Sequence, residues 1–318
     1  MTTIKDLNPQ STAFVFPGQG SQAVGMGRDL AEAFPTAGAV FREADSLLGF
    51  SLSDVMWNGP GEILNDTVNT QPALFVHSMA AWTVFEEVFS GFRPTVLAGH
   101  SLGELSALTA GGALPFRTAL KLVRRRGELM KKAGERNPGG MAAVLNIDIQ
   151  TLEAVCKAAS TPDEIVQVAN DNSPGQIVIS GAISAVSRAM EGAKAAGAKR
   201  AIPLAVSIAA HSTLMAVIQD EWNQAVDEAG LRDSTMPLIG NVEAVLISDA
   251  GDLSKDIQRQ MQSRVRWTET VLAAARMGID TFVEAGAGTV LVGLVKRIAP
   301  DAEGIPMGTA ADIEALKG

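Results

Sequence analysis

The chain has 318 residues, 47% of them hydrophobic and 19% charged, a balance that excludes a disordered chain and allows about two domains of ordinary size. Its formal net charge of −9 disfavours nucleic-acid binding, because an acidic surface repels phosphate groups. The single cysteine, Cys156, excludes an internal disulfide and a cysteine-based metal cluster, and no run of about 18 apolar residues predicts a membrane span.

The N-terminal part of the chain alternates short apolar runs with helical patterns. The run TAFVF (12–16) predicts a strand, and helical periodicity follows over 37–48 and 71–88. TVLAGHS (95–101) predicts a second strand that runs into a helix, and a further helix covers 115–133, with a proline in its first turn. Strands that alternate with helices predict an α/β fold with a parallel sheet.

Residues 138–207 have a different order of elements, βαββαβ. We predict the strands and helices over 141–147, 149–160, 165–170, 176–181, 183–197 and 199–206, in that order. The turn between the two central strands is predicted at DNSPG (171–175). This order is that of a ferredoxin-like module, which predicts a small domain inserted into the larger one.

The α/β pattern resumes after the small domain. Strands are predicted at 237–242 and 280–286, and helices at 252–262, 268–277 and 289–299. The segments on either side of the insertion are therefore expected to form one α/β domain.

A serine nucleophile is the strongest chemical prediction of the sequence. GHSLG (99–103) has the G-x-S-x-G form, follows a predicted strand and begins a predicted helix, which is the context of a nucleophile elbow. Ser101 would then lie at a helix N-terminus, where backbone N–H groups stabilise an oxyanion. The alternative, without chemistry, is a glycine-rich turn with a serine N-cap.

Three histidines are available as its base. His100 adjoins Ser101 on the turn and is expected to point elsewhere, and His77 lies in a mostly apolar helix, where a buried structural histidine is more common. His211 follows a predicted strand in a polar break and comes after the serine in the chain. Elimination therefore favours His211, and spacing alone gives it no acidic partner.

Two further segments give weaker signals. GQGSQ (18–22) follows the first strand and could supply backbone donors, but it lacks the GK[ST] of a Walker A loop and the spacing of a G-x-G-x-x-G fingerprint. Arg124, Arg125 and Arg126 lie about 100° apart around a helix, so a solvated position is the residue-based expectation for each of them.

Eight motifs cover nearly the whole chain and resemble, in order and spacing, those of the malonyl-CoA:acyl-carrier-protein transacylases. They are FPGQGSQ…GM (16–26), NTQPALF (69–75), GHSLGE (99–104), RRGELM (125–130), ANDNSPGQIVISG (169–181), AHSTLM (210–215), QMQSRVRW (260–267) and EAGAGTVLVGL (284–294). The resemblance implies an α/β-hydrolase-like catalytic domain, formed by 1–137 and 208–318, with a ferredoxin-like domain at 138–207.

The same resemblance implies roles for the site residues. Ser101 would be the nucleophile and His211 its base, and the backbone N–H groups of Gln19 and Leu102 would form the oxyanion hole. Arg126 would bind the malonyl carboxylate, because a guanidinium pairs with a carboxylate through two parallel hydrogen bonds.

Four further residues receive roles from the family motifs. Gln260 matches the family glutamine whose backbone carbonyl orients the histidine, so that a dipole takes the place of a triad acid. Asn170 and Asn172 fall in the segment that faces the pantetheine arm, and Gln71 of NTQPALF is expected among the substrate-binding residues. The resemblance implies no metal ligand.

One segment departs from the family pattern. Before the histidine, relatives often carry a Phe for malonyl selectivity or a Tyr-Ala-Ser run for methylmalonyl, and here the residues are Ile208-Ala209-Ala210. Because alanine stands where a bulky side chain would fit, a roomier acyl pocket is expected, and the acyl selectivity stays open.

The resemblance implies an acyl-carrier-protein S-malonyltransferase of fatty-acid synthesis, which acts on malonyl-CoA and acyl carrier protein through a malonyl-serine intermediate. The CoA thioester is a substrate, and no cofactor, nucleic acid or membrane is implied. Open alternatives are a trans-acting polyketide-synthase acyltransferase, the malonyltransferase subunit of a malonate decarboxylase and, from a different class, a serine thioesterase or esterase. A monomer is expected, and because MTTIKDLNPQST lacks the layout of a secretion signal, so is a cytoplasmic location.

Overall fold

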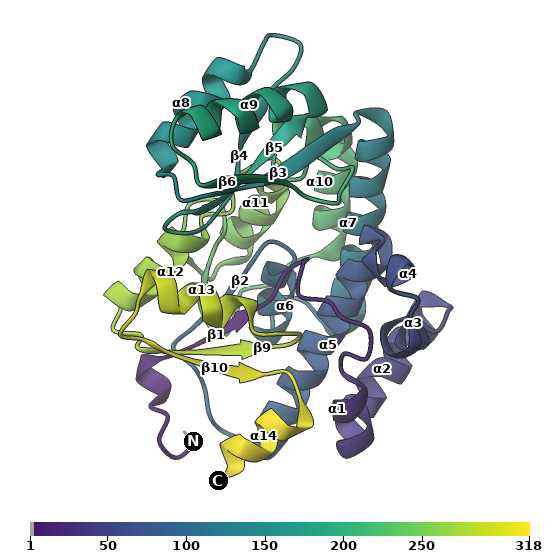
Figure 1. The fold of residues 1–318 in the computed structure, drawn as a ribbon. Coiled ribbons are helices and arrows are strands. Elements are labelled where there is room, and N and C mark those ends of the chain that lie inside the picture. The colour runs from purple at the N-terminus through teal and green to yellow at the C-terminus, as the bar shows by residue number, and fades with distance from the viewer. Residues whose placement is uncertain (1–2) are drawn as a thin grey trace.

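Two β-sheets form the framework of the protein in the computed structural model, which describes residues 3–318 (Figure 1). The larger sheet has six strands in the order β10-β9-β1-β2-β7-β8. They are β1 (Thr12–Phe16), β2 (Val96–Gly99), β7 (Leu238–Ile239), β8 (Leu246–Ile247), β9 (Thr281–Ala285) and β10 (Glu303–Met307). All neighbouring strands are parallel except β7 and β8, which confirms the predicted α/β fold with a parallel sheet.

Helices cover both faces of this sheet because its central strands are apolar on both sides. In β1, Phe14 and Phe16 belong to one hydrophobic core, and Ala13 and Val15 belong to another on the opposite face. The first core includes α5 (Thr67–Val88), α6 (Gly103–Ala110) and α7 (Phe116–Arg136), and the second includes α12 (Trp267–Arg276) and α13 (Val290–Ile298). A strand buried on both faces reads as a continuous apolar run, which is why 12–16 is visible in the sequence.

The smaller sheet lies at one end of the molecule and carries two helices on its outer face (Figure 1). It is antiparallel, in the order β4-β5-β3-β6. Its elements are β3 (Gly139–Leu145), α8 (Ile149–Ala159), β4 (Val166–Ser173), β5 (Gln176–Ala182), α9 (Ile183–Ala195) and β6 (Arg200–Pro203), which is the predicted βαββαβ order. Ala142 and Val144 of β3 pack in a core with the helices, whereas Met141 and Ala143 line a cavity on the other face.

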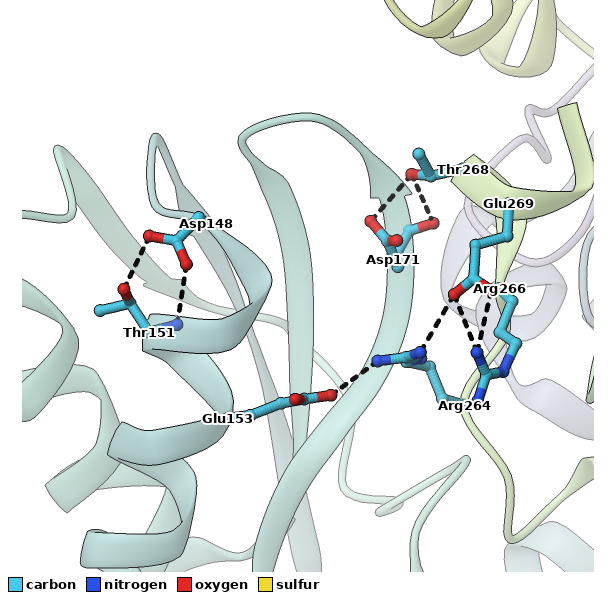
Figure 2. A network of polar contacts seen from close by, with 8 residues as sticks. All are labelled: Asp148, Thr151, Glu153, Asp171, Arg264, Arg266, Thr268 and Glu269. Carbon is cyan, nitrogen blue, oxygen red and sulfur yellow. Dashed lines mark hydrogen bonds and ion pairs between the residues drawn. The ribbon is translucent and has the colours of Figure 1, made fainter. Parts of the chain in front are cut away.

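Strand β4 joins the smaller sheet to the segment that precedes α12. Asp171 N–H donates to the Val265 carbonyl at 2.9 Å, and Val265 N–H donates to the Ala169 carbonyl at 2.8 Å. Side chains strengthen this junction, because Thr268 Oγ1 donates to Asp171 Oδ1 at 2.8 Å and Arg264 pairs with Glu153 of α8 at 2.7 Å (Figure 2). The two sheets are therefore held in a fixed relation along one side of the cavity.

The remaining elements complete the covering layers. They are η1 (Pro9–Ser11), α1 (Arg28–Ala33), α2 (Pro35–Leu48), α3 (Leu52–Asn58), α4 (Gly61–Asn65), η2 (Thr213–Ile218), α10 (Gln219–Ala229), α11 (Ala250–Gln260) and α14 (Ala310–Lys317). Within residues 3–318, no helix combines the length and the apolar content that crossing a bilayer requires.

Most predicted boundaries differ from the observed ones by a few residues, and three strands show the physical differences. β4 continues to Ser173, so the turn after it consists of 174–175 instead of 171–175. Its last residues stay in the strand because Asp171 is bound to Val265 across the junction and is followed by a register shift against β5. β7 contains only two residues of the predicted 237–242, and β6 ends at 203 instead of 206.

Candidate active site

A tight turn between β2 and α6 presents Ser101. Its φ is +53°, in the left-handed region that L residues rarely adopt. Gly99 and Gly103 make this turn possible, since a Cβ on Gly99 would lie 1.9 Å from the Gly103 carbonyl carbon and one on Gly103 would lie 2.0 Å from the Phe16 oxygen. The G-x-S-x-G spacing therefore forms the strand–turn–helix arrangement of a nucleophile elbow.

His211 lies against the serine in the geometry of a general base. Ser101 Oγ is 2.7 Å from His211 Nε2. On the other side of the ring, Nδ1 faces the backbone carbonyls of Gln260 at 3.0 Å and Ser263 at 3.1 Å. Because a carbonyl only accepts, Nδ1 carries the proton and Nε2 is left to accept the proton of Ser101.

The electrostatic surroundings keep His211 neutral. Burial, and after it the positive charge of Arg126, lower the pKa of His211 to about 3. Its partners at Nδ1 are dipoles rather than a carboxylate, so nothing offsets these two effects with a full negative charge. The imidazole is therefore neutral across the neutral pH range, with its proton on Nδ1 and with Nε2 as the acceptor.

Arg126 is a buried cation beside the serine. It is 1% exposed, and Nη1 donates to Gln71 Oε1 at 2.7 Å while Nη2 donates to Gln260 Oε1 at 2.8 Å and to Ser101 Oγ at 3.1 Å. Among residues 3–318 these three partners are neutral, and Nε–H has no partner. Burial lowers the pKa of Arg126 to about 10, which leaves it charged at neutral pH. A buried guanidinium with spare donors is suited to bind an anionic group.

Ser101, His211 and Arg126 open into a cavity of about 290 Å³ between the two sheets. The elements around the larger sheet supply the reactive groups, and the smaller sheet supplies part of the wall. The lining residues are Gln19, Thr67, His100, Ser101, Leu102, Arg126, Met130, Met141, Ala143, Asn170, Asn172, Gln176, Val178, Leu204, Val206, Ile208, Ala210 and His211. The cavity thus combines a nucleophile, a base and a cation with a largely apolar wall, which is typical of a ligand site.

The two backbone donors expected for an oxyanion hole both border this cavity. Gln19 lies after β1 and Leu102 directly after the serine. Neither of their N–H groups donates to another group of the described residues. Both donors are therefore available to an oxygen atom placed near Ser101 Oγ.

The structure separates the other expected substrate-binding residues. Asn170 and Asn172 line the cavity from β4. Gln71 does not: it is 0% exposed and contacts Arg126 and Met130 instead, because its position on α5 faces α7. Its expected direct contact with substrate is thus replaced by a contact with the arginine.

The other two histidines have structural partners. His100 lies at the cavity, where Nε2 is 2.8 Å from Asn172 Oδ1 and the ring packs edge-on against Trp267. His77 is 3% exposed, and its Nε2 contacts the Gly308 carbonyl at 2.7 Å. His77 therefore lies in the core, as its apolar helix predicts, and His100 is a link between the elbow and β4.

The three consecutive arginines of α7 have different surroundings. Arg124 pairs with Glu128 at 2.9 Å, and Arg125 pairs with Glu221 at 2.9 Å, both near the surface. The residue-based expectation of a solvated position is wrong for Arg126, which the 100° step per residue turns into the core between α5 and the elbow.

Two polar residues at the elbow were not identified from the sequence. Asn241 Oδ1 accepts the Ser101 N–H at 2.8 Å, and its Nδ2 donates to the Gly99 carbonyl at 2.7 Å. Glu104, 2% exposed, follows the serine on α6. The only signal is their place in sequence, at the end of the predicted strand 237–242 and inside GHSLGE. Among residues 3–318, no three His, Cys, Asp or Glu side chains are arranged to hold a metal ion.

Comparisons with known proteins agree with this geometry. The chain matches the acyl transferase domain over residues 13–311. A malonyl CoA-acyl carrier protein transacylase of Haemophilus influenzae is 42% identical over 305 residues, which cover 96% of this chain and 97% of that protein.

Solved structures of similar proteins share the fold over nearly the whole chain. An acyl carrier protein S-malonyltransferase of Vibrio cholerae superposes with a TM-score of 0.93 at 42% identity, covering 96% of this chain and 100% of the other. A malonyl-transacylase in complex with a type II PKS acyl-carrier protein gives a TM-score of 0.93 at 40% identity, covering 96% and 98%. The chain therefore belongs to the acyl transferase domain family, among the malonyl-CoA:acyl-carrier-protein transacylases that its eight motifs resemble.

Proposed function

We propose that this enzyme transfers a malonyl group from malonyl-CoA to the phosphopantetheine thiol of acyl carrier protein, as an acyl-carrier-protein S-malonyltransferase of fatty-acid synthesis. The observation that carries the proposal is the buried guanidinium of Arg126, which lies 3.1 Å from a serine oxygen that is itself 2.7 Å from a neutral histidine. The names of the relatives support the same substrates.

The first half-reaction forms an ester on the serine. Ser101 Oγ attacks the thioester carbonyl of malonyl-CoA while its proton moves to His211 Nε2. The C–S bond then breaks, and the CoA sulfur leaves with the proton that His211 holds. The products are free CoA and a malonyl-serine ester.

The second half-reaction repeats the sequence with the carrier protein. The phosphopantetheine thiol gives its proton to His211 and its sulfur attacks the ester carbonyl. The C–O bond breaks, and Ser101 Oγ recovers the proton from the histidine. Each step is a proton transfer or a displacement at a carbonyl, so the proposed reaction needs no cofactor beyond the CoA thioester that is its substrate.

The negative charge that develops in both steps falls on the carbonyl oxygen. The N–H groups of Gln19 and Leu102 border the cavity beside Ser101 and are not used elsewhere in the described chain. We assign them to this oxygen, because prearranged backbone donors stabilise an oxyanion without reorganisation.

Arg126 would hold the free carboxylate of the malonyl group. Its Nε–H is unpartnered, and Nη2 donates to Ser101 Oγ. A malonyl group whose carboxylate is bound by Arg126 would therefore have its thioester carbonyl close to the nucleophile. Asn170 and Asn172, on β4, would contact the pantetheine arm, which enters between the two sheets.

The two sheets correspond to the two proposed domains. Residues 1–137 and 208–318 would form an α/β-hydrolase-like catalytic domain, and 138–207 a ferredoxin-like domain. The serine elbow after a parallel strand and the βαββαβ order of the antiparallel sheet support these names. We also expect a monomer, as the resemblance implies, and a cytoplasmic location.

Three other functions would use the same serine and histidine. A trans-acting polyketide-synthase acyltransferase is favoured by the likeness to a malonyl-transacylase that was solved with a type II PKS acyl-carrier protein, and it differs only in the carrier. A malonate-decarboxylase subunit would also transfer malonyl. A thioesterase would use water as acceptor, and the buried Arg126 argues against it, because hydrolysis requires no carboxylate clamp.

The test is a panel of acyl-CoA substrates with a phosphopantetheinylated carrier protein, read by intact mass. We expect a malonyl adduct on the enzyme, its loss to the carrier, and little free malonate. Ser101→Ala should accumulate no adduct. A persisting adduct on Ser101→Ala, or release of the acyl group as free acid in place of transfer, would contradict the proposal.

A further inference from the structure

Two amide side chains hold the backbone of Ser101 from both ends. Asn241 Oδ1 accepts the Ser101 N–H at 2.8 Å, and Gln260 Nε2 donates to the Ser101 carbonyl at 2.9 Å. Asn241 Nδ2 also ties the residue to the Gly99 carbonyl at 2.7 Å. A residue with φ of +53° keeps that conformation only where its surroundings determine it, and these contacts provide the restraint.

A buried acid pair, Glu104 and Asp256, contacts both amide residues. Glu104 Oε1 and Asp256 Oδ2 accept from the Asn241 backbone N–H, at 3.1 Å and 3.2 Å. Glu104 Oε2 accepts from Gln260 Nε2 at 2.5 Å. The two acids are 2% and 8% exposed and come from α6 and α11, on different sides of the elbow. The acid pair thus holds Asn241 by its backbone N–H and Gln260 by its side-chain amide.

Ionisation of both buried carboxyl groups of the acid pair is unfavourable. Both carboxyl groups converge on one N–H, and burial followed by the negative charge of Asp256 raises the pKa of Glu104 well above its ordinary value. Burial also raises the pKa of Asp256. An uncharged amide separates the acid pair from Arg126, since Gln260 Nε2 donates to Glu104 and Gln260 Oε1 accepts from Arg126 Nη2.

We propose that the acid pair positions the nucleophile. Through the backbone N–H of Asn241 and the side-chain amide of Gln260, it fixes Ser101 in its strained conformation. The inference rests on Ser101 being the nucleophile of the proposed reaction. The same arrangement keeps the acid pair out of direct contact with Arg126. A carboxylate in direct contact with the guanidinium would compete with the substrate carboxylate. The Gln260 amide is uncharged, so it leaves the positive charge of Arg126 available to the substrate.

The test measures the reactivity of Ser101 with an uncharged alkyl fluorophosphonate. The Oγ–P bond forms, fluoride leaves, and intact mass gives the rate without malonyl-CoA or a carrier protein. We expect Glu104→Ala to slow phosphonylation about 10-fold or more, because the Asn241 and Gln260 amides lose an acceptor. Glu104→Gln keeps one of the two acceptor oxygens and should recover only part of that loss. Asp252→Asn, an exposed acid on the same helix as Asp256, is the matched control and should react as the parent.

A mutant cycle separates positioning from general destabilisation. If the acid pair acts through Asn241 and Gln260, then adding Glu104→Ala to a protein that carries Asn241→Ala and Gln260→Ala should slow the reaction by less than about threefold further. Losses that multiply, or a Glu104→Ala protein of unchanged melting temperature that reacts like the parent, would overturn the inference. If Glu104→Ala does not fold, Asp256→Ala carries the same cycle from the α11 side.

The cycle also distinguishes this inference from the proposed function. A parent enzyme that is phosphonylated at Ser101 but forms no malonyl ester would refute the proposed reaction. The phosphonylation rates would still decide whether the acid pair positions the serine.

Discussion

Arg126→Ala separates recognition of the acyl carboxylate from the acyl-transfer chemistry. The guanidinium is 1% exposed, so a carboxylate bound to it is removed from water. Truncating one partner of such a buried, hydrogen-bonded charge pair costs about 2–5 kcal/mol. We therefore expect kcat/KM for malonyl-CoA to fall by a factor of about 30 to about 4,000, at about 1.4 kcal/mol for each factor of ten. Acetyl-CoA has no carboxylate to lose, so its kcat/KM should be preserved or improved.

The assay compares initial rates of carrier-protein acylation with malonyl-CoA and acetyl-CoA for the parent and the variant. Arg125→Ala is the matched control, because that side chain leaves the same helix toward Glu221 and away from the cavity. It should change neither rate by more than about threefold, as expected for a surface ion pair. Equal losses with both substrates in Arg126→Ala would refute the carboxylate clamp and indicate damage to Ser101 itself.

The remaining predictions concern titration. Because burial and then the charge of Arg126 lower the pKa of His211 to about 3, kcat/KM should stay constant well below the ordinary histidine value of about 6.5 and fall only as pH approaches the lowered pKa. With acetyl-CoA as substrate, Arg126→Ala should shift this acid limb upward, and an unshifted limb would exclude the electrostatic coupling. Burial raises the pKa of Glu284 to about 7 from 4.5, so the folded state loses about 3 kcal/mol as pH rises through that window. Urea unfolding should therefore show Glu284→Gln gaining on the parent between pH 5 and pH 8, and a constant difference would contradict the raised pKa.

The strands that the sequence predicted best are those buried on both faces. β1 reads as a nearly continuous apolar run because helices cover both of its faces, and β9 is also buried throughout, although Glu284 interrupts its apolar run. β10 was missed because it contains Gly304 and Pro306 and lies at the edge of the sheet, where a proline costs no ladder hydrogen bond to a further strand. α10 was missed because it is mostly polar and buries little beyond Trp222 and Val226.

Parts of the site were predictable to the degree that their signal is local. The elbow could be predicted because its motif occupies five consecutive residues. His211 could be chosen as the base by elimination among three histidines. Arg126 could not be chosen from residues alone, because three consecutive arginines on one helix are distinguished only by what α5 and the elbow place around each. The contacts of Asn241 and Gln260 with the Ser101 backbone could not be predicted for a similar reason, since both residues reach the serine from distant segments of the chain.

The residues before His211 lack the aromatic side chain that relatives often carry there. Of the three residues before His211, Ile208 and Ala210 line the cavity, whereas Ala209 is 0% exposed. Met130 lines the same cavity, and its sulfur accepts from Gln71, the residue that also holds Arg126. A thioether side chain adapts its shape more readily than an aromatic ring. We therefore expect charge selection by Arg126 and size selection by its apolar neighbours to be separate, so that the missing ring relaxes only the second.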